Sequence, residues 1–170
     1  MEKVRIVVDQ ETLELTPLQL VSGEVYERIS GVIYVQLGDH PFPSPRWYDL
    51  CTSILAMWLL TVNKHLLGRE NVARLHFMDG NYSIELVYQN NRQSLMRFME
   101  PNETCVLERE IDIRYFARQL LAASARIIDH FPQNRNSRNI QEISELTDVL
   151  RNTLRKIRTQ ESESILSGQL

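Results

Sequence analysis

The chain has 170 residues, of which 43% are hydrophobic and 24% are charged, and its formal net charge is −3 at pH 7. These proportions are typical of a globular protein and argue against wholesale disorder. The slightly acidic balance argues against a general nucleic-acid-binding protein, and the length allows one domain with room for a helical appendage.

The N-terminal part of the chain is predicted to form strands and turns. Val4–Val8 is a short run rich in β-branched residues, and Leu13–Leu20 alternates imperfectly around a proline, which is typical of an edge strand. Glu24–Ile29 and Val32–Leu37 flank Ser30-Gly31, a dipeptide that we expect to form a hairpin turn. This region is therefore predicted to contribute several strands to a sheet.

An apolar segment follows a proline-studded loop that contains Trp47 and Tyr48. Ser44 and Pro45 predict the start of a helix, as N-cap and first-turn residue, and Gly68 is placed to end it. Apolar residues recur at the intervals of three and four that a buried helix face requires. They are Leu50, Cys51, Ile54, Leu55, Trp58, Leu59, Val62 and Leu66. The unbroken apolar run is far shorter than the roughly 18 residues that suggest a membrane span, so we predict a core helix.

Three strands connected as a meander are predicted next. Asp79-Gly80 is a strong signal for a two-residue hairpin turn between Val72–Met78 and Tyr82–Tyr88. A second turn, Gln89–Arg92, leads into Ser94–Met99. Apolar and polar residues alternate along the middle strand, which is typical of a half-buried antiparallel sheet.

The remainder of the chain is predicted to be mainly helical, after one more short strand at Cys105–Glu108. Asp112 is the predicted N-cap of a helix that ends before Pro132. A polar linker, Gln133–Asn139, precedes an amphipathic helix that is expected to reach Ile157. Acidic residues precede basic residues along this last helix, which suits its dipole.

The predicted fold is therefore α+β. A largely antiparallel sheet of about six strands packs against one core helix, with a second helix after the meander and a C-terminal helix. We predict a single domain over residues 1–132, a linker and amphipathic helix over 133–158, and a flexible tail over 159–170. The C-terminal helix either folds back onto the domain or pairs with a second copy of the chain. Its apolar stripe includes Ile140, Ile143, Leu146, Leu150 and Leu154.

The sequence contains no catalytic or metal-binding motif. The four histidines and two cysteines lack zinc-site spacing, and there is no nucleophile elbow and no phosphate-binding glycine loop. We therefore predict no catalytic residue, no metal and no cofactor. An enzyme whose site is assembled from distant residues, such as His40, Asp49 and His76, is the least favoured alternative. The N-terminus lacks a signal-peptide pattern and the thiols are expected to be reduced, so we expect a cytoplasmic protein.

Two features favour binding to a protein partner. A group of glutamates before the predicted helix is either a solvated loop or a docking patch for a basic partner. The aromatic residues of the proline-rich loop belong to the types that are enriched in interface hot spots, although tryptophan is more often a core residue. The predicted partner-binding residues are Trp47, Tyr48, Glu100, Glu103, Glu108 and Glu110.

Several segments together resemble a pattern in small bacterial proteins, some of which are encoded near polymorphic toxins and are thought to act as cytoplasmic immunity proteins. The segments are Phe42-Pro43, Trp47 with Asp49, the helix residue Trp58, and Phe77–Tyr82 (FMDGNY). The resemblance spans Val25 to Ile128. It implies a non-enzymatic binding protein that blocks a cognate toxin by surface complementarity, with acidic side chains facing a basic toxin surface. A self-associating structural or regulatory protein is the alternative, and neither nucleic acid nor membrane is predicted as a partner.

Overall fold

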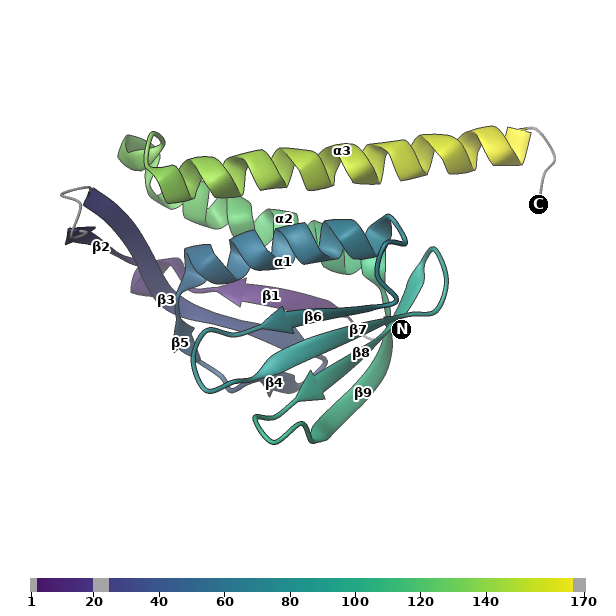
Figure 1. Ribbon diagram of the computed structural model, residues 1–170, viewed down its shortest axis with the longest axis horizontal. Coiled ribbons are helices and arrows are strands. Elements are labelled where there is room, and N and C mark those ends of the chain that lie inside the picture. The colour runs from purple at the N-terminus through teal and green to yellow at the C-terminus, as the bar shows by residue number, and fades with distance from the viewer. Residues whose placement is uncertain (1–2, 20–24, 167–170) are drawn as a thin grey trace.

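The computed structural model describes residues 3–19 and 25–166, and the ends predicted for two strands, Leu20 and Glu24, lie outside them, as does the predicted tail beyond Leu166. Within the described residues, the strands form two antiparallel sheets, and three α-helices pack above them (Figure 1). The predicted α+β class, with a helix after the meander and a C-terminal helix, is confirmed.

The first sheet is organised around one long strand, β3, with which every other strand of the sheet pairs. Its N-terminal half pairs with β2 and its C-terminal half with β1, while β4 and β5 are short segments held against β3. The strands are β1 (Val4–Val8), β2 (Glu14–Gln19), β3 (Val25–Leu37), β4 (His40–Phe42) and β5 (Tyr48–Asp49). These two short segments are part of the reason why the described residues contain nine strands where about six were predicted.

The predicted hairpin turn at Ser30-Gly31 is wrong, because β3 continues through it. Close packing around position 31 leaves no room for a side chain larger than that of glycine. A Cβ atom on Gly31 would lie 2.9 Å from the Leu13 side chain and 3.2 Å from the Thr12 carbonyl oxygen. The backbone N–H of Val32 also donates to the Thr12 hydroxyl at 2.8 Å. Gly31 therefore allows β3 to pass close to the segment that contains Thr12 and Leu13.

The second sheet is the predicted meander, in the order β6-β7-β8-β9. Its strands are β6 (Val72–His76), β7 (Ser83–Tyr88), β8 (Gln93–Met99) and β9 (Cys105–Asp112). The turn at Asp79-Gly80 is longer than the predicted two residues, because Phe77 and Tyr82 close it with an N–H to carbonyl bond of 3.0 Å. β9 is also longer than predicted, since it pairs with β8 as far as Asp112.

Helix α1 (Cys51–Leu66) begins later than Ser44-Pro45 predicted. The segment before it is held extended: Tyr48 and Asp49 pair with β3, and the Trp47 carbonyl oxygen accepts a 2.8 Å bond from the Ile33 N–H. A helix cannot include residues whose backbone is already paired in a sheet. The predicted end is confirmed, because Gly68 follows the helix with a φ of 66°.

Helix α2 (Ile113–His130) starts as predicted, since the Asp112 carboxylate accepts bonds from two N–H groups of its first turn. In Figure 1, α1 and α2 cover the sheets and α3 (Arg138–Leu166) lies across both helices. The two sheets also touch each other, because Phe42 of β4 stacks on Phe98 of β8 with ring centres 4.5 Å apart. Trp58, at the centre of α1, is completely buried.

Helix α3 folds back onto its own chain. Ile140, Ile143 and Leu150 are buried in the common core, and Leu146 and Leu154 pack against it. The helix also continues through the segment predicted to be a flexible tail. There Glu161 forms a bidentate ion pair with Arg114 at the start of α2. This ion pair anchors α3 beyond Ile157.

Candidate functional site

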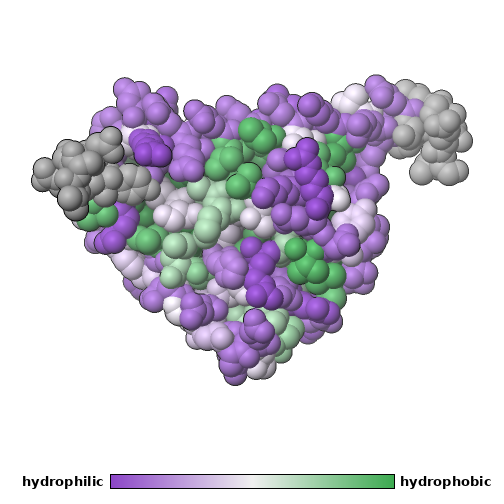
Figure 2. All heavy atoms as spheres, in the orientation of Figure 1, coloured by the Kyte–Doolittle hydropathy of each residue, from purple (hydrophilic) through white to green (hydrophobic). Residues whose placement is uncertain are grey.

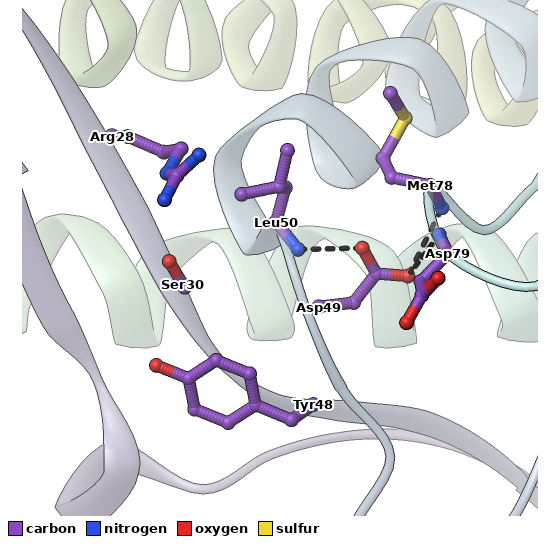
Figure 3. Close-up of a pocket in the computed structure, with 7 residues that line it drawn as sticks. All are labelled: Arg28, Ser30, Tyr48, Asp49, Leu50, Met78 and Asp79. Atoms are coloured by element: carbon purple, nitrogen blue, oxygen red, sulfur yellow. Dashed lines mark hydrogen bonds between the residues drawn. The ribbon is translucent and has the colours of Figure 1, made fainter. Parts of the chain in front are cut away.

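A buried carboxylate, Asp49, organises the loop that precedes α1. Its side chain is only 5% exposed. One oxygen accepts the backbone N–H of Leu50 at 2.7 Å. The other accepts the Trp47 indole N–H at 3.0 Å and the backbone N–H groups of Met78 and Asp79 at 3.0 and 3.2 Å. Asp49 thus ties the aromatic loop to the β6–β7 connection (Figure 3).

A pocket of about 250 Å³ opens above this carboxylate. Figure 3 shows Arg28 and Ser30 projecting from β3 on one side and Met78 and Asp79 on the other, with Tyr48 beside them. We call these five residues the Tyr48 surface. Tyr48 and Met78 are 48% and 47% exposed. Among the described residues, no carboxylate pairs with the Arg28 guanidinium.

Tyr48 is held in place by its hydroxyl group, which donates to the Glu14 carboxylate at 3.1 Å. Partial desolvation, and then this hydrogen bond, raises the pKa of the Tyr48 hydroxyl above its ordinary value. Its ring remains open to solvent. The result is an exposed aromatic side chain with a fixed orientation.

Trp47, the other aromatic residue that was predicted to bind a partner, is half-buried. Its ring packs edge-on against Tyr82 and Phe77, with centres 5.2 and 6.4 Å apart, and its indole N–H is used by Asp49. Trp47 therefore forms the packed base of the loop, and Tyr48 presents the accessible ring.

The predicted acidic residues lie elsewhere, on β9 and the turn before it, in the other sheet. Glu103 pairs with Arg74 at 3.6 Å, and Glu108 pairs with Arg97. Arg97 lies on the adjacent strand β8 and Arg74 lies on β6, and both are distant from these glutamates in the chain, so no local pattern indicated this neutralisation. Glu100 and Glu110 are exposed. The predicted partner-binding residues therefore fall into two separate groups.

The three residues named for an assembled catalytic site have different surroundings. His40 lies exposed on β4 and His76 lies exposed on β6. Asp49 is buried, and both of its oxygens already accept hydrogen bonds. Within the described part of the chain, no hydrogen bond joins these three side chains to one another.

Sequence reasoning missed Arg28, Ser30, Met78 and Asp79 as members of a shared surface. β3 and the β6–β7 connection are far apart in the chain, and only the completed fold brings them together around Tyr48. The one local signal was Asp79 in a turn, which indicated an exposed side chain but no neighbour.

Across residues 3–19 and 25–166, no helix has the length and apolar content needed to cross a membrane. The same residues contain no group of three or more histidine, cysteine or acidic side chains arranged to hold a metal ion. No family model, curated protein or solved structure matches the chain.

Proposed function

We propose that the protein acts by binding another protein, and that the Tyr48 surface contacts this partner. The observation that carries the proposal is an exposed tyrosine and methionine beside an arginine that pairs with no carboxylate among the described residues, all bordering a pocket built on the Asp49 network. Tyrosine, methionine and arginine are the residue types enriched at protein interfaces.

The rigidity of this surface supports the proposal. Four hydrogen bonds fix the Asp49 carboxylate, and a fifth fixes the Tyr48 hydroxyl. A partner that docks here would lose little free energy to ordering of the loop. Arg28 and Asp79, which carry opposite charges on the two sides of the pocket, would orient the partner.

The resemblance to immunity-type proteins gives this proposal a specific form: a cytoplasmic, non-enzymatic protein whose partner is a toxin. Self-association is the second candidate. If it uses α3, the contact must lie on the outer face of this helix, because Ile140, Ile143 and Leu150 are buried within the chain.

The test compares proteins captured from the native cell extract by four tagged chains: wild type, Tyr48→Ala, Arg28→Glu and the control Arg118→Glu. Arg118 is an exposed arginine on α2 and does not line the pocket of the Tyr48 surface. We expect one stoichiometric partner on wild type and Arg118→Glu that is lost from the other two. A partner held equally by all four chains would reject the Tyr48 surface.

The toxin form of the proposal is tested separately. The captured partner is expressed alone and together with this chain in a growth assay. We expect growth to be arrested by the partner alone and restored by wild type but not by Arg28→Glu. A partner that is harmless when expressed alone would reject the immunity function while leaving protein binding intact.

A further inference from the structure

The free edge of the second sheet offers a different kind of contact. β9 is the last strand in the order β6-β7-β8-β9, and no other described strand pairs with its outer edge. In Figure 1 the start of β9 lies at the lower margin of the molecule, and its C-terminal end leads into α2. An uncovered strand edge presents unpaired N–H and C=O groups to which another strand can add.

The backbone of β9 is reachable from outside the ladder with β8. The Glu108 carbonyl oxygen accepts a 2.7 Å hydrogen bond from the guanidinium of Arg109, an exposed side chain of the same strand. The residues from Cys105 to Arg109 are exposed except for Leu107, which is half-buried. A strand that adds to this edge would therefore have to displace only a solvent-exposed side chain, the Arg109 guanidinium, from the Glu108 carbonyl oxygen.

Charges alternate in a row across the outer face of the sheet. Arg74 lies opposite Glu85, Glu85 opposite Arg97, and Arg97 opposite Glu108, so the signs run plus, minus, plus, minus from β6 to β9. Ion pairs join Arg74 to Glu85 and Arg97 to Glu108. Figure 2 shows strongly hydrophilic residues over the middle of this sheet. The next position in the row, on an added strand, would favour a cation.

The neighbouring row on the same face ends in a second carboxylate. It runs from Val72 through Val87 and Leu95 to Glu110. Among the described residues, no cation pairs with Glu110. Because Glu108 and Glu110 are two residues apart, they point to the same face, and an added strand would meet both with alternate side chains.

A second copy of the chain fits this edge poorly. Residues directly opposite each other in an antiparallel pair share one face of the sheet. The two registers that pair most of β9 with itself therefore place Glu108 opposite either Glu108 or Glu110 of the other copy. Like charges directly opposite each other are destabilising. Pairing of β9 with a second copy of β9 is therefore disfavoured, and pairing with a basic strand is favoured.

We propose that β9 accepts an extended segment of another protein as a fifth strand of this sheet, and that the segment carries lysine or arginine two residues apart, opposite Glu108 and Glu110. Its intervening residue would face Arg109 and be polar or acidic. This inference does not rest on the Tyr48 surface, which is built from β3, β5 and the β6–β7 connection and includes no residue of β9.

The test uses the full chain and two fluorescent peptides of identical composition, with fluorescence anisotropy at physiological salt. In one peptide two lysines alternate with threonine and valine, and in the other the same lysines are adjacent. We expect the alternating peptide to bind saturably and the adjacent isomer to bind at least roughly tenfold more weakly. Glu110→Lys should weaken binding by a similar factor, and Glu142→Lys, on the exposed face of α3, should not.

Two versions of the alternating peptide with N-methyl groups on opposite edges complete the test. Only the version whose N-methyl groups lie on the edge facing away from β9 should bind. A methylated amide on the other edge could not donate a hydrogen bond to β9. The proposal is overturned by equal binding of both lysine isomers, by binding of both methylated versions, or by no saturable binding up to about 1 mM. A dimer of the wild-type chain that dissociates in Glu110→Lys would also overturn it.

Discussion

Trp58 donates its indole N–H to the backbone carbonyl oxygen of His76 at 2.8 Å, and so joins the middle of α1 to the end of β6. Trp58→Ala removes both this bond and a completely buried ring. We expect the free energy of unfolding to fall by about 3–5 kcal/mol, as is usual for an emptied aromatic core site. Chemical denaturation measures it, with Met57→Ala, at an exposed neighbour, as the control. Equal effects of the two substitutions would remove Trp58 from the core.

Asp49→Asn should destabilise the protein although the side chain keeps its size. The amide nitrogen of asparagine would face at least one of the four N–H donors that the carboxylate now accepts. We expect a loss of about 2–4 kcal/mol, measured by denaturant unfolding. Asp79→Asn, on an exposed residue of the same pocket, should change stability by less than about 0.5 kcal/mol. A matching loss in both variants would contradict the role given to Asp49.

Stability should fall when the protein is acidified below the ordinary histidine pKa, because of His65. This side chain is buried and contacts Ser94 Oγ at 2.9 Å. Desolvation by burial lowers the pKa of His65 below its ordinary value of 6.5. The unfolded chain therefore binds a proton near pH 6.5 while the folded chain does not. The contribution of His65 is complete above pH 6.5 and declines as the pH falls from there towards its folded pKa.

The measurement for His65 is the denaturation midpoint at a series of pH values between about 7 and 5. His65→Gln should show a smaller decrease over this range than the wild type, because glutamine does not titrate. His40→Gln, at an exposed histidine, serves as the control and should keep the wild-type decrease. Identical pH profiles for wild type and His65→Gln would contradict the prediction.

The two cysteines should differ sharply in reactivity. Cys51 is completely buried, and its burial, with the nearby Asp49 carboxylate, raises the pKa of the thiol to about 12. Cys105 is exposed at the start of β9. We expect a maleimide reagent to label one thiol in the native protein and both after denaturation, with no native labelling of Cys105→Ser. Rapid labelling of Cys51 in the native state would contradict the prediction, because it would show that the reagent reaches the first turn of α1.

Leu150→Asp distinguishes folding from self-association as the role of α3. Leu150 is completely buried, whereas its neighbour Val149 is 48% exposed. A charge at position 150 should lower the free energy of unfolding by more than about 3 kcal/mol, while Val149→Asp should change it by less than about 0.5 kcal/mol. Thermal unfolding and the mass in solution are measured together. A stable Leu150→Asp chain of halved mass would show that α3 joins two copies.

The sequence was most informative where periodicity and capping act locally. The spacing of Ile54, Trp58 and Val62 identified the buried face of α1, and Asp112 identified the start of α2. Both signals depend on contacts within a few residues, so they can be recognised without the fold.

The errors arose where a distant segment decides the local structure. Ser30-Gly31 has the composition of a turn, but the crossing chain at Leu13 holds it in a continuous strand. Ser44-Pro45 has the composition of a helix start, but pairing of β5 with β3 delays α1. The Tyr48 surface could not be predicted for the same reason, since β3 and the β6–β7 connection are far apart in the chain and lie together only in the tertiary structure.

The claim that the Tyr48 surface binds a protein partner is tested most directly by titrating the purified captured partner into wild type, Arg28→Glu and Arg118→Glu in a calorimeter. We expect Arg118→Glu to match the wild type and Arg28→Glu to bind at least roughly tenfold more weakly, with both variants melting like the wild type. Equal affinity of all three folded chains would contradict the account and place the partner on another surface.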